Sequence, residues 1–194
     1  MKTLKTGFAY LLLLSAIACT KSIKEPPTAS SANASDLSEA TASFTIGQSY
    51  HGGIIFYIDN TGQHGLIAAT VDQGTGISWK RGANVVTGAS GTARGTGASN
   101  TAAIIAALGN KGNYAALLCS RYKVGAYTEW YLPSKVELNL MYAKKAIIGN
   151  FGASNYWSSS EVSKGKAWDQ EFGGGFQFKD NKKFTLNVRA ISSF

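Results

Sequence analysis

The stretch at residues 128–142, TEWYLPSKVELNLMY, constrains the fold more than any other part of this sequence. Ser134 and Glu137 have the S-x-x-E spacing of a capping box, in which each side chain accepts a hydrogen bond from the other residue's backbone N–H at the start of a helix. Pro133 precedes the cap, and Gly149 is a natural stop. The pattern therefore predicts a helix. Its predicted buried face consists of apolar residues at spacings of four, three and four: Val136, Leu140, Ala143 and Ile147.

Segments rich in β-branched and aromatic residues lie on both sides of this helix. Two apolar runs within residues 52–70 are separated by turn-forming residues and predict a β-hairpin. Residues 82–100 are mostly glycine and small polar side chains, which predict a long loop, and two short helices are expected over residues 101–108 and 114–121. Apolar and polar residues alternate in the C-terminal third and predict an antiparallel meander. Strands at both ends and two to three short helices between them make an α+β fold.

The N-terminus has the features of a secretory signal. Lys2 and Lys5 precede an apolar run that is too short to span a membrane, and small residues lead to Cys19. The stretch resembles a bacterial lipobox, which implies that Cys19 is lipidated; an ordinary signal peptide cut nearby is the alternative. Residues 20–43 are rich in Ser, Ala and Thr and are expected to form a disordered tether on the order of 25–30 Å long. The predicted organisation is a signal at 1–19, a tether, and one domain at 44–194.

These features predict a lipid-anchored protein of the cell envelope, in the outer membrane of a Gram-negative bacterium. The predicted domain is also basic. From Phe44 to Phe194 it contains 15 Lys and Arg against 8 Asp and Glu, a net charge of +7. Such an excess attracts polyanions, of which nucleic acid is not expected for an exported protein; the alternative is that the charge only keeps the domain soluble. Five lysines gather late in the chain: Lys164, Lys166, Lys179, Lys182 and Lys183.

Aromatic residues near these lysines could serve as stacking platforms for sugar rings, although core packing is the usual role of a tryptophan. We expect a loop to expose Tyr156 and Trp157 together with the serine run that follows. The candidate ligand-binding residues are therefore Tyr156, Trp157, Ser158, Glu161, Lys164, Lys166, Lys179, Lys182 and Lys183. The residues expected to be structural are Trp130, Pro133, Ser134, Glu137, Trp168 and Arg189. Arg189 is predicted to form a buried ion pair with Glu137 or with Glu161.

The sequence predicts no enzymatic activity, no cofactor and no metal site. His51 and His64 are isolated and lack the spacing of metal ligands, and neither is accompanied by the motif of a catalytic base. Cys119 lies in an apolar run and is expected to be a buried, unreactive thiol. The glycines of residues 82–100 lack the Gly-Lys-Ser/Thr ending of a phosphate-binding loop.

Seven segments, in this order, resemble the Lcl C-terminal domain family, which is found at the C-terminus of Legionella collagen-like adhesins. They are YHGGIIFYID, QHGLIAAT, GTGASNT, WYLPSKVELNLMY, YWSSSE, AWDQEFGGGFQ and VRAI, and they span roughly residues 47–191. The resemblance implies a compact fold related to C-type lectin-like and sulfatase-modifying-factor domains, attachment to glycosaminoglycans, and no known enzymatic activity. The calcium motifs of sugar-binding C-type lectins are absent, and of the family's final basic pair only Arg189 is present.

Two functions are consistent with these observations. The first is an adhesin-like domain that binds glycans or other polyanions at the cell surface. The second is a structural or assembly lipoprotein that binds another envelope protein and has no glycan site.

Overall fold

The structure, a computed structural model, describes residues 43–194, and every structural statement below concerns these residues. The predicted signal at residues 1–19, the lipidation site Cys19 and all but the last residue of the predicted tether, residues 20–43, lie outside the described residues.

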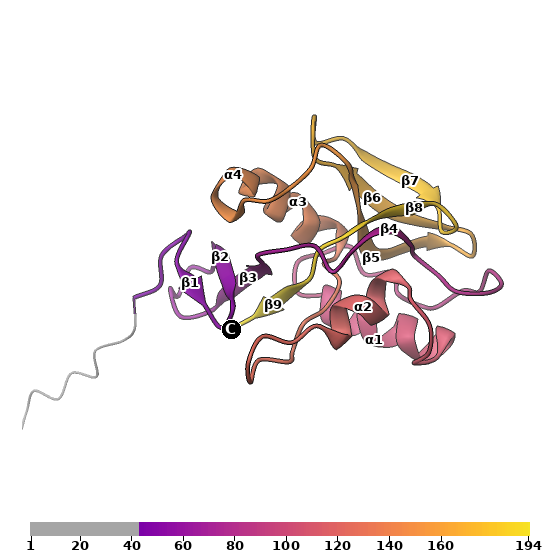
Figure 1. Ribbon diagram of the computed structural model, residues 1–194, viewed down its shortest axis with the longest axis horizontal. Coiled ribbons are helices and arrows are strands. Elements are labelled where there is room, and N and C mark those ends of the chain that lie inside the picture. The colour runs from indigo at the N-terminus through magenta and orange to yellow at the C-terminus, as the bar shows by residue number, and fades with distance from the viewer. Residues whose placement is uncertain (1–42) are drawn as a thin grey trace, which may run out of the picture. The chain divides into compact units, whose positions relative to one another are not determined.

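The described chain contains nine strands and four helices (Figure 1). In chain order they are β1 (Ser49–Tyr50), β2 (Gly53–Ile58), β3 (Gly65–Ala69), β4 (Gly74–Ser78), α1 (Gly97–Leu108), α2 (Ala115–Arg121), α3 (Lys135–Ala143), α4 (Lys145–Ile148), β5 (Asn155–Ser163), β6 (Lys166–Glu171), β7 (Gln177–Asn181), β8 (Thr185–Val188) and β9 (Ile191–Ser193). All four helices lie between β4 and β5 in the sequence, so the fold is α+β, as predicted.

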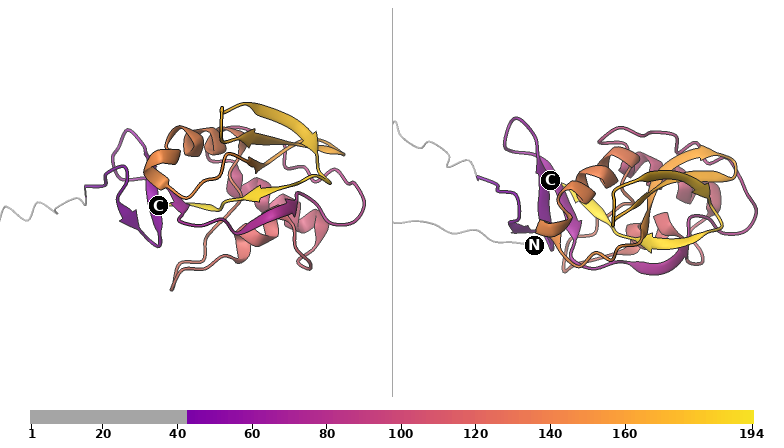
Figure 2. Two further views of the ribbon diagram at one scale, coloured as in Figure 1. Left: turned by 45° about the horizontal axis from the view of Figure 1, so that its top comes forward. Right: turned by 90° about the horizontal axis from the view of Figure 1, so that it is seen from above.

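The strands form two sheets, with the orders β1-β2-β3-β9 and β4-β8-β5-β6-β7. The predicted hairpin is present as β2 and β3, and the first two strands of the predicted meander as β6 and β7. Strand β5, a segment predicted to be a loop, pairs with β6 as a further antiparallel strand. The last part of the chain does not continue the meander. Instead β8 runs parallel to β5 on its other side, and β9 leaves this sheet to pair with β3. The C-terminal strands therefore join the two sheets (Figures 1 and 2).

Strand β5 is covered on both of its faces, which explains two separate cores. Trp157 packs with residues of α1 and α2, whereas its neighbour Tyr156 packs with Leu138 and Met141 of α3. Because successive side chains of a strand point to opposite faces, adjacent aromatic residues can enter different cores. Both rings are fully buried.

The capping box of α3 is present. The Ser134 hydroxyl accepts from the Glu137 N–H at 3.3 Å, and Glu137 Oε2 accepts from the Ser134 N–H at 2.8 Å. Glu137 also reaches out of the helix, because its Oε1 accepts from Gly95 N–H at 2.7 Å. Its Oε2 lies so near Gly97, the first residue of α1, that a Cβ there would be 2.3 Å away. The carboxylate of Glu137 thus joins α3 to the loop before α1.

The prediction of which residues form the buried face of this helix was wrong. Val136 and Ile147 are exposed, by 41% and 47%, and the helix is divided at Lys144 into α3 and α4. The buried residues are instead Glu137, Leu138, Met141 and Ile148. The inward position of Glu137 sets the rotation of the helix, and a hydrophobic pattern alone does not reveal that a carboxylate faces inward.

Both ends of the described chain meet in one aromatic cluster. The ring of Phe44 lies 4.7 Å from that of Phe194 and 4.9 Å from that of Tyr50, measured between ring centroids. Tyr50 and Phe194 are 5.1 Å apart. The cluster therefore joins the segment before β1 to the residue that follows β9.

The substitution Glu137→Ala tests the junction between α3 and the preceding loop. It leaves the N–H groups of Ser134 and Gly95 without their acceptor, so we expect it to lower the free energy of unfolding by about 3 kcal/mol. The matched control is Val136→Ala on the exposed side of the same helix turn, which should cost less than about 0.5 kcal/mol. Chemical denaturation measures both values. Equal costs for the two variants would contradict the observed rotation of the helix.

Candidate functional site

The expectation that a loop exposes Tyr156, Trp157 and Ser158 is wrong. All three lie in β5 and are fully buried. The Tyr156 hydroxyl donates to Asp72 Oδ2 at 3.0 Å, and the Trp157 indole N–H donates to the Ile77 carbonyl at 2.9 Å. These residues are therefore part of the core and cannot touch a ligand.

The serine run of β5 holds neighbouring segments in place. Here the register of β5 against β6 shifts, and hydroxyl groups bond segments that the strand ladder does not reach. Ser158 donates to the Trp168 carbonyl at 2.8 Å, Ser159 accepts from Asn100 at 3.2 Å, and Ser160 donates to the Gly91 carbonyl at 2.7 Å. Ser160 thus holds the long loop before α1, Ser159 holds the first turn of α1, and Ser158 holds β6.

Glu161 and Lys182, both predicted to bind ligand, form a buried ion pair with each other. Glu161 also accepts from the N–H groups of Thr87 and Gly88, at 3.0 and 3.1 Å. Burial lowers the pKa of Lys182, an effect that the hydrogen bond to Glu161 opposes. With exposed fractions of 8% and 1%, the two side chains are structural.

Arg189 forms a buried ion pair, as predicted, but both predicted partners were wrong and the acid is Asp72. Its Nε donates to Asp72 Oδ1 at 2.5 Å, and neither Glu137 nor Glu161 is in contact with it because both are engaged elsewhere. The same guanidinium donates to the carbonyls of Ala69 at 2.9 Å and Asn150 at 2.7 Å.

Four of the lysines predicted to bind ligand are exposed, and two of them, Lys166 and Lys179, lie on the same side of the β6–β7 pair as Trp168. This follows because Trp168 is directly opposite Lys179 and two residues from Lys166. The ammonium groups of Lys135 and Lys179 lie 3.9 and 5.0 Å from the centre of the Trp168 ring. The adjoining turns carry Lys164 and Lys183, both exposed, and these turns are close to each other because Lys182 N–H donates to the Gly165 carbonyl at 3.0 Å. We call these residues the lysine face: Lys135, Lys164, Lys166, Trp168, Lys179 and Lys183.

On the opposite side of β6, Asp169 is buried and has one oxygen without a partner. Its Oδ2 accepts from Asn155 at 2.7 Å, whereas its Oδ1 has no hydrogen bond within the described structure. Burial, and to a smaller extent the nearby charge of Asp180, raises the pKa of Asp169 from 3.8 to about 6. Asp169 therefore destabilises the fold when it is ionised.

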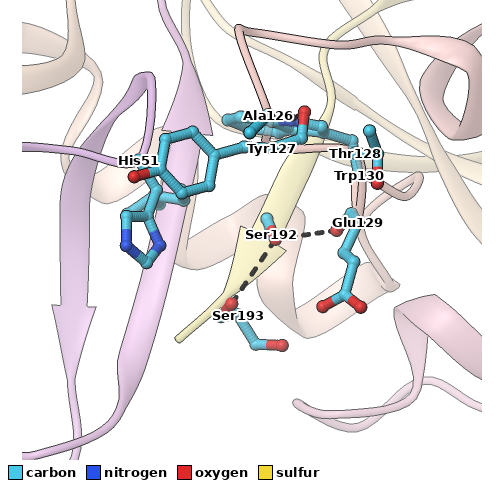
Figure 3. Close-up of a pocket in the computed structure, with 9 residues that line it drawn as sticks. His51, Ala126, Tyr127, Thr128, Glu129, Trp130, Ser192 and Ser193 are labelled. Carbon is cyan, nitrogen blue, oxygen red and sulfur yellow. Dashed lines mark hydrogen bonds between the residues drawn. The ribbon is translucent and has the colours of Figure 1, made fainter.

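A second surface lies at the other end of the domain, where the segment before α3 passes the end of β9. Three adjoining cavities of about 290, 190 and 360 Å³ share Ser193 in their walls. We call them together the groove. Figure 3 shows the first cavity, where Ser192 and Ser193 lie between the stacked rings of His51 and Tyr127 on one side and Glu129 on the other. The backbone there is held because the Ser192 hydroxyl donates to the Glu129 carbonyl at 2.7 Å.

A stack of three rings forms one wall of the groove. His51 lies between Tyr50 and Tyr127, at centroid distances of 3.7 and 4.1 Å and with interplanar angles of 21° in both pairs. His51 has a positive φ of 48°, which is uncommon for a residue with a side chain. A Cβ on the next residue, Gly52, would lie 2.5 Å from Val124, so only glycine lets the turn before Tyr127 pack this closely.

The remaining side chains that could carry chemistry are Cys119 and the acidic and histidine residues. Burial raises the pKa of the Cys119 thiol well above its usual range, and the residue is fully buried, as predicted. No cluster of three or more His, Cys, Asp or Glu within residues 43–194 is placed to hold a metal ion. In that same range, none of the helices has the length and apolar character needed to cross a membrane.

The fold defines a compact α+β domain with two mostly antiparallel sheets. The family model of the Lcl C-terminal domain matches this chain over residues 68–192, from β3 to β9. The chain therefore belongs to the Lcl C-terminal domain family, a group of adhesin-related C-terminal domains. A comparison with curated proteins finds no match.

The sequence did not predict two features of these surfaces, the contact of Trp168 with the lysines and the groove. Trp168 was expected to be purely structural, yet it is half-buried and supports two ammonium groups. Its position two residues from Lys166 was a usable signal, because both side chains must then point to one face of a strand. The groove had no comparable signal, since its walls come from segments that are far apart in the sequence.

The contribution of the buried Lys182 to stability can be distinguished by mutation from that of an exposed lysine. Lys182→Ala leaves the Glu161 carboxylate buried without its countercharge, so we expect a loss of about 3–5 kcal/mol in the free energy of unfolding. Lys183→Ala, at the adjacent exposed position, should change it by less than about 0.5 kcal/mol. A Lys182 variant as stable as the Lys183 variant would show that the pair does not hold the fold.

Asp169 predicts a dependence of stability on pH. Because its folded pKa of about 6 exceeds its ordinary value of 3.8, the folded state binds the proton more tightly, and stability should fall as the pH rises between these values. Asp169→Asn should therefore stabilise the domain near neutral pH by up to about 3 kcal/mol, and this gain should shrink toward pH ~4. Denaturation at a series of pH values measures it. A difference that is constant with pH would contradict the assignment.

Proposed function

We propose that this chain is a non-catalytic binding protein of the cell envelope whose lysine face holds sulfated or carboxylated glycans. The observation that supports this most directly is the position of Lys135 and Lys179 over one indole ring, that of Trp168. The ring faces attract cations, so the tryptophan keeps two positive charges close together without neutralising either. A chain of anionic sugars presents repeated charges that can meet several ammonium groups at once.

The distribution of the acidic residues strengthens this positive surface. Glu137, Glu161 and Asp169 are buried, and Asp72 pairs with Arg189. These four acids therefore neutralise little of the charge that solvent sees. The lysines of the lysine face remain mostly exposed, so an anionic polymer meets a field of one sign.

The position of the lysine face suits a domain held at its N-terminal end. Strands β6 and β7 lie at the end of the domain away from β1, near which the described chain begins (Figures 1 and 2). If the signal and Cys19 attach the chain to a membrane, as the sequence predicts, a ligand can approach the lysine face from the opposite side. Lipid anchoring in the outer membrane is part of this proposal and rests on the sequence alone.

A structural lipoprotein that binds another envelope protein is the second candidate. Three exposed phenylalanines near β7 favour it: Phe176, Phe178 and Phe184 have exposed fractions of 69%, 43% and 46%. Phe178 lies on the side of β7 away from Lys179, so a protein partner there would leave the lysine face free.

Heparin affinity at increasing salt tests the first candidate. The triple variant Lys164→Gln, Lys166→Gln, Lys179→Gln should bind about tenfold more weakly, because three exposed charge pairs of roughly 0.5 kcal/mol each are lost. For the unaltered protein, affinity should fall steeply above 0.1 M salt, where the screening length is about 10 Å.

The matched control removes the same charge elsewhere, with Lys111→Gln, Lys123→Gln and Lys144→Gln, all at exposed positions. It should keep most of the affinity. If both triple variants lose affinity equally, binding reflects net charge and the lysine face is not a site. If the unaltered protein does not bind heparin and a pull-down recovers a single envelope protein through Phe178, the second candidate is correct.

A further inference from the structure

We propose that the groove is a second binding site, separate from the lysine face, that takes uncharged pyranose sugars. The two surfaces share no lining residue. The groove consists of aromatic, hydroxyl and carboxylate groups around Tyr127, Glu129 and Ser193 (Figure 3). A pyranose has an apolar C–H face and a rim of hydroxyl groups, so its chemistry matches this arrangement.

The aromatic wall is held in place before any ligand binds. Tyr127 is 44% exposed, yet His51 and Tyr50 support its ring from behind. An exposed tyrosine normally has little packing to hold it, whereas here the strained backbone of His51 and the close contact at Gly52 fix the turn beneath it. A ring fixed in advance loses little conformational entropy when a sugar stacks on it.

The polar side of the first cavity can accept and donate hydrogen bonds. Glu129 is exposed and forms no salt bridge within residues 43–194, so both of its carboxylate oxygens can accept from vicinal sugar hydroxyls. The hydroxyl groups of Thr128 and Ser193 add groups that both donate and accept. Polar groups that converge beside an aromatic side chain fix the orientation of a ligand in small-molecule sites.

The groove continues beyond one sugar unit. The adjoining cavity of about 360 Å³ lies between Trp130 and the face of α1 that presents Ala102 and Ile105, and Glu129 lines both cavities. Small side chains on the helix leave room for a flat ring, and the apolar surface suits its C–H face. An oligosaccharide of two or three units can therefore lie along the groove with its hydroxyl groups near Glu129.

The charge of the groove separates its ligand from that of the lysine face. No lysine in the described part of the chain lines the groove. Its one Arg, Arg94, lines the second cavity together with Asp59, whereas the carboxylate of Glu129 lines the first and third cavities without a countercharge from residues 43–194. A sulfated or carboxylated sugar would be repelled by Glu129, while an uncharged sugar would not. Binding in the groove should therefore depend little on salt, in contrast to binding at the lysine face.

The test is an NMR titration of the purified full chain with four neutral trisaccharides: maltotriose, cellotriose, mannotriose and triacetylchitotriose. At least one should shift the amide signals of Tyr127, Glu129 and Ser193, with the same affinity at low and at high salt. Tyr127→Ala and Glu129→Gln should each weaken that binding by about tenfold. Glu129→Gln changes an exposed side chain and keeps its shape, so it tests the site even if Tyr127→Ala disturbs the turn.

The lysine-face triple variant is the matched control and should bind the neutral sugar normally, while Glu129→Gln should keep its affinity for heparin. The proposal for each site can then be contradicted without affecting the proposal for the other. The proposal is overturned if none of the four sugars shifts these amides, or if Glu129→Gln binds the sugar as well as the unaltered protein does.

Discussion

The buried guanidinium of Arg189 connects the parts of this domain that would otherwise be independent. Arg189 lies where the chain passes from β8 to β9, and its partner Asp72 lies where the chain passes from β3 to β4. Both links run between the two sheets. The same side chain donates to the Asn150 carbonyl in the segment between α4 and β5. Three crossing segments thus meet at one cation with several fixed donors, and removing it would leave a buried carboxylate and carbonyls without partners. The positions of β9 in the groove and of β8 beside β5 both depend on this contact.

Local patterns predicted the local structure well. The capping box of Ser134 and Glu137, the hairpin of β2 and β3, and the buried thiol of Cys119 each follow from a few neighbouring residues. The predictions that failed depend on contacts between distant segments. The pairing of Glu161 with Lys182 and of Arg189 with Asp72 could not be read from spacing, because any acid that the fold brings close would serve.

The failure at β5 has a specific physical cause. Tyr156 to Glu161 contain three serines and an acid, which resemble an exposed loop in composition, yet the segment is the central strand of the larger sheet. A buried strand can hold polar side chains only when every one of them finds a partner. Here the partners come from β6, from the first turn of α1 and the loop before it, and from Lys182. The serines and the glycine-rich loop therefore form one structural unit, although neither part looks structured by itself.

The aromatic cluster at the two ends of the described chain has a mechanical consequence. Phe44 precedes β1, and its ring contacts Tyr50 and Phe194. If the lysine face holds a ligand, as proposed, a pull on the chain before Phe44 acts first on these ring contacts and on the two-residue strand β1, not on the larger sheet. Because apolar contacts are short-range, they separate after a small extension. The domain is therefore expected to open under tension from its N-terminal edge, so the lysine face can stay folded and attached while the first strand is already released.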